Sequence, residues 1–387
     1  ACFTLKAKIP DIHAQTGSYT VNSIGETPTG CFPIYVQPND PAGTSANLLI
    51  DDFYSSVINI GFPFPFYGLT YNTLIASPNG VVSFDISNAG LITHYGILRD
   101  IFGLSALAGV PEDLPSSLYD RSIIMGPYHD LNFQEPTSPG RRIQYQTVGT
   151  APHRKWILSY YMMPLYYNTG GCNLLIENTH QIVLYESTGI IEVLMFSKQP
   201  CTPWNQGRGM IGIQNNSRTQ GLMVNGRKAS DPPWGTPGMQ EAYRFVPSAG
   251  SSLFKRVELC DLSGTVLQTG TVASLGNGKL EASFPNICPV VGSTVTYVVR
   301  SVYTKFDDPA TEVFGTDTVR VTKNADPDLH ATATATNTDC YSPTGTITIN
   351  VPVTTSPPPY LFQLDGGTPV SGSSPYTFTN IGPGPHT

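Results

Sequence analysis

Pairs of adjacent acidic residues are the feature of this sequence that comes nearest to catalytic chemistry. Asp51-Asp52 and Glu112-Asp113 each offer the two carboxylates that a glycosidase uses as acid and base. Adjacent residues on a strand point to opposite faces, so we expect neither pair to act as acid–base partners. We interpret both pairs as solvated loop carboxylates.

Calcium is the one metal for which the sequence offers ligands. Asp130-Leu131-Asn132 could supply oxygen ligands together with Asp51-Asp52 or Asp120. None of these residues has EF-hand spacing, and two or three loop acids rarely complete a six-oxygen shell. The alternative is that Asp130 ties a turn through backbone N–H groups. We favour this alternative, and we predict no metal and no cofactor.

Catalytic motifs were sought and not found. The sequence has no His-Glu-x-x-His of zinc hydrolases, no Gly-x-Ser-x-Gly of serine hydrolases and no Gly-x-x-x-x-Gly-Lys-Ser/Thr phosphate loop. We therefore predict that the chain is not an enzyme.

Aromatic residues are the best candidates for binding. Tyr160-Tyr161, Tyr166-Tyr167 and Trp204 lie in a stretch rich in Tyr, Met and Pro. On a strand, one tyrosine of each pair faces outward, and an exposed ring could stack on a sugar. The competing interpretation, which we favour, is that these rings pack in a β-sandwich core. The candidate ligand-binding residues are Tyr161, Tyr167 and Trp204.

Six of the seven cysteines fall into pairs that are close in sequence. Pairing of neighbours would join Cys2 to Cys31, Cys172 to Cys201 and Cys260 to Cys288, although six cysteines allow fifteen pairings. Disulfides indicate an oxidising compartment, so we expect an extracellular protein. Cys340 is left without a partner.

Composition excludes two classes of partner and indicates β-structure. The net charge of −7 comes with no basic block, which argues against nucleic-acid binding. No stretch approaches 18 consecutive apolar residues, so we expect no membrane-spanning segment. Only 13% of the 387 residues are charged, whereas 37 Gly, 34 Pro and 20 Tyr suit turn-rich strands.

The elements that must position these residues are short strands separated by Gly, Pro and Asn. Asn-Gly pairs at Asn79-Gly80, Asn225-Gly226 and Asn277-Gly278 predict tight turns. We predict an all-β protein in which a large N-terminal β-sandwich precedes small immunoglobulin-like modules in a linear array. The predicted domains are residues 1–248, 253–322 and 328–387.

The third predicted domain contains a distinctive series of residues, namely Cys340, Gly345, Ile347, Ile349, Pro358-Pro359-Tyr360, Leu364-Asp365-Gly366-Gly367 and Phe378-Thr379-Asn380-Ile381. In this order they resemble the SprB repeat of gliding-motility adhesins of Bacteroidota. That repeat ends in a further strand and a second cysteine, which do not follow here, so we expect the module to be incomplete and the natural chain to continue.

The first predicted domain contains three motifs in order, Gly-Phe-Pro-Phe-Pro-Phe-Tyr-Gly at 61–68, Asn-Gly-Val-Val-Ser-Phe at 79–84 and Gly-Pro-Tyr-His-Asp-Leu at 126–131. With these motifs it resembles nidogen-like domains of type IX-secreted surface proteins. In such surface proteins, Asp-(Ser/Thr)-aliphatic motifs carry O-glycans, so Thr318 in Asp317-Thr318-Val319 is a candidate glycosylation site.

The two resemblances imply the N-terminal part of a very large cell-surface adhesin. It would be exported across the outer membrane by the type IX secretion system and would serve surface attachment and gliding motility. Its partners would be extracellular surfaces or glycans and the secretion and gliding machinery. One alternative is a structural capping or partner-binding module of a surface protein. Another is a secreted carbohydrate-active protein with β-sandwich accessory domains, which a convergent cluster of acids in the first domain would indicate.

Overall fold

The computed structural model describes residues 2–24, 43–97, 111–166, 177–323, 331–336, 344–352, 358–382 and 384–387. Over these ranges the regular structure consists of strands and two short 3-10 helices, η1 (Ile86–Asn88) and η2 (Asn205–Gly207). The predicted all-β fold is confirmed. No helix in these ranges has the length and apolar character needed to cross a membrane.

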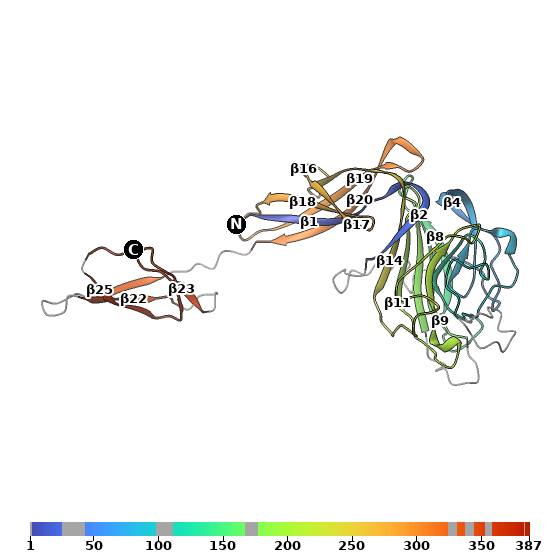
Figure 1. Cartoon of the computed structure of the whole chain (residues 1–387), viewed down its shortest axis with the longest axis horizontal. Coiled ribbons are helices and arrows are strands. Elements are labelled where there is room, and N and C mark those ends of the chain that lie inside the picture. Colours follow the sequence, from blue (N-terminus) through green and yellow to red (C-terminus); the bar gives the residue numbers. More distant parts are fainter. Residues whose placement is uncertain are drawn as a thin grey trace. The chain divides into compact units, whose positions relative to one another are not determined.

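A seven-stranded sheet forms one layer of the first sandwich (Figure 1). Neighbouring strands are antiparallel throughout. In spatial order the strands are β2 (His13–Ser23), β14 (Glu241–Ser252), β11 (Ile191–Ser197), β10 (Glu177–Tyr185), β9 (Lys155–Pro164), β8 (Arg142–Val148) and β3 (Thr44–Ser45).

A six-stranded antiparallel sheet forms the other layer. In spatial order its strands are β13 (Gly221–Met223), β12 (Met210–Gln214), β7 (Ile123–Tyr128), β6 (Val81–Ser83), β5 (Leu69–Ala76) and β4 (Ile58–Phe66).

The core of the first sandwich lies between these two sheets. In β4, Phe62 and Phe64 alternate with the exposed Pro63, as expected of a strand with one buried face. Trp156 of β9 is fully buried in the same cluster, which draws side chains from both sheets. Because the aromatic side chains of both layers interdigitate, the two sheets bury each other's apolar faces.

A second sandwich follows, and it takes one strand from the start of the chain. The tight turn Asn277-Gly278, with φ of 50° and 69°, joins two of its strands, as predicted. One sheet has the order β1-β18-β17 and the other has the order β16-β15-β19-β20. The strands are β1 (Phe3–Pro10), β15 (Phe254–Cys260), β16 (Val266–Thr269), β17 (Thr271–Gly276), β18 (Lys279–Ile287), β19 (Thr294–Lys305) and β20 (Asp308–Thr322).

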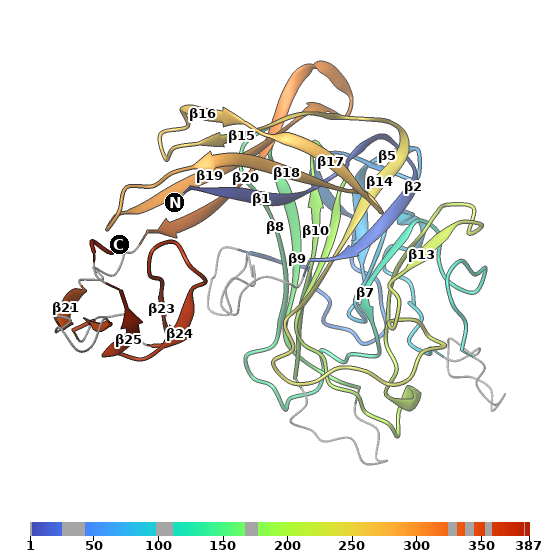
Figure 2. The same ribbon diagram turned by 60° about the vertical axis from the view of Figure 1, so that its left-hand side comes forward.

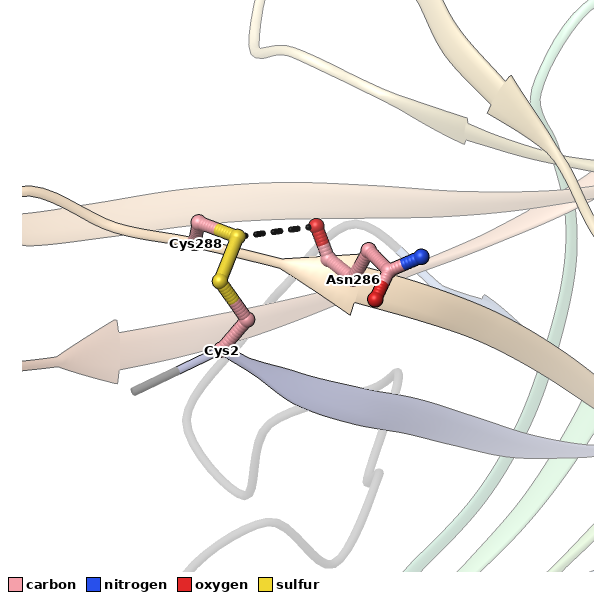
Figure 3. Close-up of a disulfide and its surroundings, with 3 residues drawn as sticks. All are labelled: Cys2, Asn286 and Cys288. Atoms are coloured by element: carbon pink, nitrogen blue, oxygen red, sulfur yellow. Dashed lines mark hydrogen bonds between the residues drawn. A yellow bond between two sulfur atoms is a disulfide. The ribbon is translucent and has the colours of Figure 1, made fainter.

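The place of β1 overturns two of the predicted disulfides. Cys2 is bonded to Cys288 (Figure 3), and the two Cα atoms are 4.4 Å apart. Cys260 is a buried free cysteine. The predicted pairs of Cys2 with Cys31 and of Cys260 with Cys288 are therefore wrong. The physical reason is that β1 pairs with β18, which brings the first residues beside the end of a strand far along the chain. Both views of the ribbon place β1 along β18 (Figures 1 and 2).

The first two sandwiches share a buried junction. Ile12 lies between β1 and β2, and its carbonyl oxygen accepts from the backbone N–H of Leu253 at 2.8 Å. Both residues belong to an apolar cluster that also contains Val246 of β14 and Tyr303 of β19. This hydrogen bond and this cluster join residues on both sides of the predicted boundary between residues 1–248 and 253–322.

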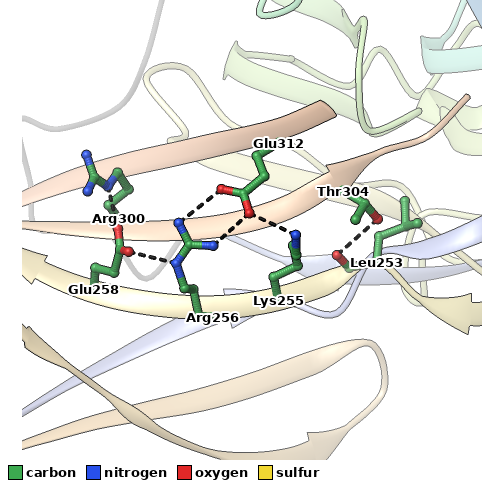
Figure 4. A network of polar contacts seen from close by, with 7 residues as sticks. All are labelled: Leu253, Lys255, Arg256, Glu258, Arg300, Thr304 and Glu312. Carbon is green, nitrogen blue, oxygen red and sulfur yellow. Dashed lines mark hydrogen bonds and ion pairs between the residues drawn. The ribbon is translucent and has the colours of Figure 1, made fainter. Parts of the chain in front are cut away.

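One face of the second sandwich carries a network of ion pairs between β15, β19 and β20 (Figure 4). The guanidinium of Arg256 contacts Glu258 at 2.7 Å and Glu312 at 2.8 Å. Arg300 also reaches Glu258 at 2.7 Å. Glu258 is buried between two arginines, so its charge is neutralised from both sides.

A small module of five strands ends the chain. Three strands lie within the residues that resemble the SprB repeat, at Gly345–Asn350, Tyr360–Phe362 and Tyr376–Ile381. Asp365 and Gly366, with φ of 50° and 71°, form a turn. Cys340 lies outside the described residues. The strands are β21 (Thr332–Thr336), β22 (Gly345–Asn350), β23 (Tyr360–Phe362), β24 (Val370–Gly372) and β25 (Tyr376–Ile381).

The chain divides into two compact units. One contains Thr4–Pro285 and Val298–Asp317, and therefore the first sandwich with most of the second. The other contains Ala1–Phe3, Asn286–Tyr297 and Thr318–Thr387.

Candidate functional site

Three aspartates meet at one end of the six-stranded sheet. Asp51 and Asp52 form a turn before β4, and Asp130 follows β7 by two residues. The antiparallel register places the start of β4 and the end of β7 at the same end of the sheet. One carboxylate oxygen from each aspartate lies within 4.8 Å of the other two. The cluster therefore gathers three like charges at one point.

Asn79, in the tight turn between β5 and β6, organises the loops that carry these acids. Its side-chain amide donates to Asp52 Oδ1 at 2.8 Å and to the carbonyl oxygen of His94 at 3.2 Å. Its side-chain oxygen accepts from the backbone N–H of Leu131 at 2.9 Å. Asn79 is fully buried, so the spacing between the Asp52 turn and the Asp130 loop is fixed from inside the protein.

The neighbouring Gly80 allows the turn to sit this close to β7. Its φ is +78°, and a Cβ at this position would lie 1.9 Å from the carbonyl oxygen of Pro127. The approach is held by a hydrogen bond from the N–H of Gly126 to the carbonyl oxygen of Gly80 at 2.9 Å. Only glycine fits here, which explains the Asn-Gly pair that the sequence shows.

Burial raises the pKa values of all three carboxyls, and repulsion from neighbouring carboxylates adds to the effect at Asp51 and Asp130. Burial, with Asp52 adding to it, raises the pKa of Asp51 to about 7. Burial raises the pKa of Asp52 to about 6, against the hydrogen bond from Asn79 that lowers it. Burial, with Asp52 and Asp51 adding to it, raises the pKa of Asp130 well above its usual range. The cluster thus favours whatever neutralises it, a proton or a cation.

Asp130 is the most enclosed of the three acids. It is only 2% exposed, and its Oδ2 accepts from the indole Nε1 of Trp204 at 2.7 Å. Within the described parts of the chain, its Oδ1 is buried without a hydrogen-bond partner, and so is Oδ1 of Asp51. Buried oxygens without a donor cost free energy unless something else compensates them.

These contacts correct two expectations about the acids. Asp51 and Asp52 lie in a turn and not on a strand, so their carboxylates converge and do not point to opposite faces. Across the described ranges, no backbone N–H donates to the carboxylate of Asp130, so it does not tie a turn. Asn132 has that role, because its Oδ1 accepts from the N–H of Gln134 at 2.7 Å.

The other predicted acids lie outside the cluster and hold loops together. Glu112 accepts from Ser116 Oγ at 2.9 Å, whereas Asp113 accepts from the N–H of Ser230 at 3.0 Å. Asp120 accepts from the hydroxyl of Tyr54 at 2.7 Å. Each of these acids has a hydrogen-bond partner within the protein, and none of them belongs to the acidic cluster.

The aromatic candidates are divided between the core and the surface. Tyr160 is fully buried, and the adjacent Tyr161 is half-buried with the guanidinium of Arg142 4.9 Å from its ring. Trp204 is half-buried and packs on Tyr166, with 5.0 Å between ring centroids. Tyr167 lies outside the described residues. Trp204 therefore joins the acidic cluster, whereas Tyr161 lies on β9 in the other sheet.

The remaining predicted sites are modification and disulfide positions. Thr318 is exposed on β20, and its glycosylation stays a prediction. Cys201 is disulfide-bonded. Cys172 and Cys31 lie outside the described residues.

Asn79 belongs to the site, although the positions of the acids in the sequence do not indicate it. The signal was present in the Asn79-Gly80 pair, which marks a turn but does not say what the asparagine side chain contacts.

Comparison with protein families gives one match. Residues 34–251 match the family model described as NIDO related, which covers more than half of the chain and the whole acidic cluster. No curated protein and no solved structure matches the chain. The expected nidogen-like domain is thereby confirmed. The chain belongs to the NIDO-related family.

Proposed function

We propose that this chain is part of a large extracellular adhesin, in which the NIDO-related domain binds a surface or glycan and the following modules act as a stalk. The observation that carries this proposal is a NIDO-related domain continued in one chain by two further small β-modules. Export by the type IX secretion system and a use in surface attachment and gliding belong to the same proposal. Their support is the likeness of residues 340–381 to the SprB repeat.

Two further features support an extracellular binding role. A disulfide closes the second sandwich, as is usual in an oxidising compartment. The first and second sandwiches also share a buried apolar cluster, so they pack on each other where the chain passes between them.

A secreted carbohydrate hydrolase is the second candidate, because the first domain contains the convergent acids that such an enzyme needs. Glycosidases place the sugar between two accessible carboxylates. Here Asp130 is 2% exposed and is covered by Trp204, so a sugar ring has no access to it. We therefore favour binding over catalysis.

Antibodies against the purified chain test the proposed function on the cells that make it. We expect labelling of intact cells, and Fab fragments should reduce the number of cells that attach to a surface under flow. Fab fragments raised against an unrelated surface protein of the same cells are the control. Labelling only after permeabilisation, or attachment unaffected at saturating Fab, would contradict the proposal.

A further inference from the structure

We propose that Asp51, Asp52 and Asp130 bind a calcium ion that joins the turn before β4 to the loop after β7. The site lies at one end of the NIDO-related domain, and the inference does not depend on the adhesin proposal. Its geometric basis is the convergence of three carboxylate oxygens within 4.8 Å of one another.

Asp130 provides an independent indication of a ligand. This side chain is 2% exposed, and its Oδ1 is buried beside two other carboxylates without a donor among the described residues. Every hydrogen bond available to the group goes to its other oxygen, from Trp204. A buried carboxylate oxygen without a donor, in a group that meets two other carboxylates, is stabilised by a cation or a shared proton.

The ligand atoms favour calcium over other cations. All three candidate ligands are carboxylate oxygens, with no cysteine or histidine among them, which indicates a hard cation. Calcium accepts six to eight oxygens in flexible geometry, whereas magnesium requires a nearly ideal octahedron. Asp51 and Asp52 are half-buried, so solvent reaches the site and water can complete the coordination shell.

Hydrogen bonds within the protein hold the candidate ligands in place, so the site is preformed. Asn79 fixes Asp52 and the Asp130 loop through hydrogen bonds of 2.8 and 2.9 Å. The ion would then bind without rearrangement of the strands, and it would relieve the repulsion among the three acids. Extracellular calcium modules have dissociation constants of about 10⁻⁴ to 10⁻³ M, and we expect this site to fall in that range.

Thermal melting of the full chain with and without calcium is the first experiment. With a dissociation constant near 10⁻⁴ M, 5 mM calcium should raise the melting temperature by about 5–9 °C relative to chelator. Asp51→Asn should abolish this rise while leaving the fold intact, because Oδ1 of Asp51 has no hydrogen bond to lose. Asp130→Asn should also abolish it.

Asp113→Asn is the matched control. Asp113 belongs to the same domain, but its carboxylate accepts hydrogen bonds from Ser230, away from the cluster. This variant should therefore keep the full rise in melting temperature with calcium. Terbium gives a direct readout of binding. Trp204 donates to Asp130, so excitation of its indole should sensitise bound terbium, and calcium should displace the signal.

Three results would overturn the proposal. The first is a wild-type melting temperature that does not change up to 10 mM calcium. The second is an equal rise in Asp51→Asn and in the wild type. The third is an equal response to magnesium at the same concentration, which would contradict the assignment to calcium. If Asp130→Asn does not fold, Asp51→Asn and its control decide the question.

Discussion

Removal of the Cys2–Cys288 disulfide should loosen β1 from the second sandwich. The bond joins residues separated by 286 positions, and loop-closure entropy for a loop of this length corresponds to about 5.7 kcal/mol. This value is an upper limit, because β1 stays paired with β18 and the hydroxyl of Tyr303 still donates to the Pro10 carbonyl oxygen at 2.8 Å. For Cys2→Ser with Cys288→Ser we expect a loss of about 2–4 kcal/mol.

Calorimetry and hydrogen exchange measure this loss together. The melting temperature of the second sandwich should fall by at least about 8 °C, and the amides of β1 should exchange faster than those of β15. Cys260→Ala is the matched control, since Cys260 is buried but forms no disulfide. Peptide mapping without reduction should recover the Cys2 and Cys288 peptides as one species. A linkage of Cys2 to another cysteine, or unchanged melting and protection in the double variant, would refute the reasoning.

Three further predictions concern glycine, ion-pair and histidine positions. Gly80→Ala should lower the free energy of unfolding, measured with urea, by at least about 3 kcal/mol, because the new Cβ meets a backbone oxygen. Gly226→Ala, at a similar φ but in open space, should lower it by about 1 kcal/mol. Equal losses in the two variants would contradict this prediction. Glu258→Gln should destabilise the second sandwich by about 1–3 kcal/mol, because the Glu258 side chain is 8% exposed and lies between two arginines. Glu312→Gln should have much less effect on the melting temperature, because the Glu312 side chain is more exposed. Burial lowers the pKa of His180 to about 3, so below pH 6.5 the unfolded chain gains a proton that the folded chain does not. The free energy of unfolding should therefore fall by about 2 kcal/mol from pH 6.5 to pH 5. His180→Phe should remove this part of the pH dependence of the melting temperature.

Local patterns in the sequence were sufficient to predict the all-β class and individual turns. Asn79-Gly80 predicts a tight turn, and the chain turns there between β5 and β6. Asn277-Gly278 predicts a hairpin, and both residues have positive φ between β17 and β18. These features depend only on neighbours in the chain, so they can be read without knowledge of the fold.

Non-local pairing explains what the sequence did not reveal. The side-chain pattern of β1 does not specify which sheet it joins, and its pairing with β18 sets the disulfide of Cys2. The convergence of the acids is non-local for a related reason. Asp51-Asp52 is a turn that the register of four strands brings to Asp130, so the spacing of these residues in the sequence does not predict that their carboxylates meet.

The path of the chain through the first two sandwiches bears on how the protein would carry force. Two chain crossings connect them, one at Ile12 between β1 and β2 and the other at Leu253 between β14 and β15. The crossings are hydrogen-bonded to each other at 2.8 Å and lie in one buried apolar cluster. In the proposed adhesin, tension entering through β15 would be shared with β1, which the Cys2–Cys288 bond holds to the end of β18. A single flexible linker would transmit the same load through one strand, so the two crossings suit the proposed role.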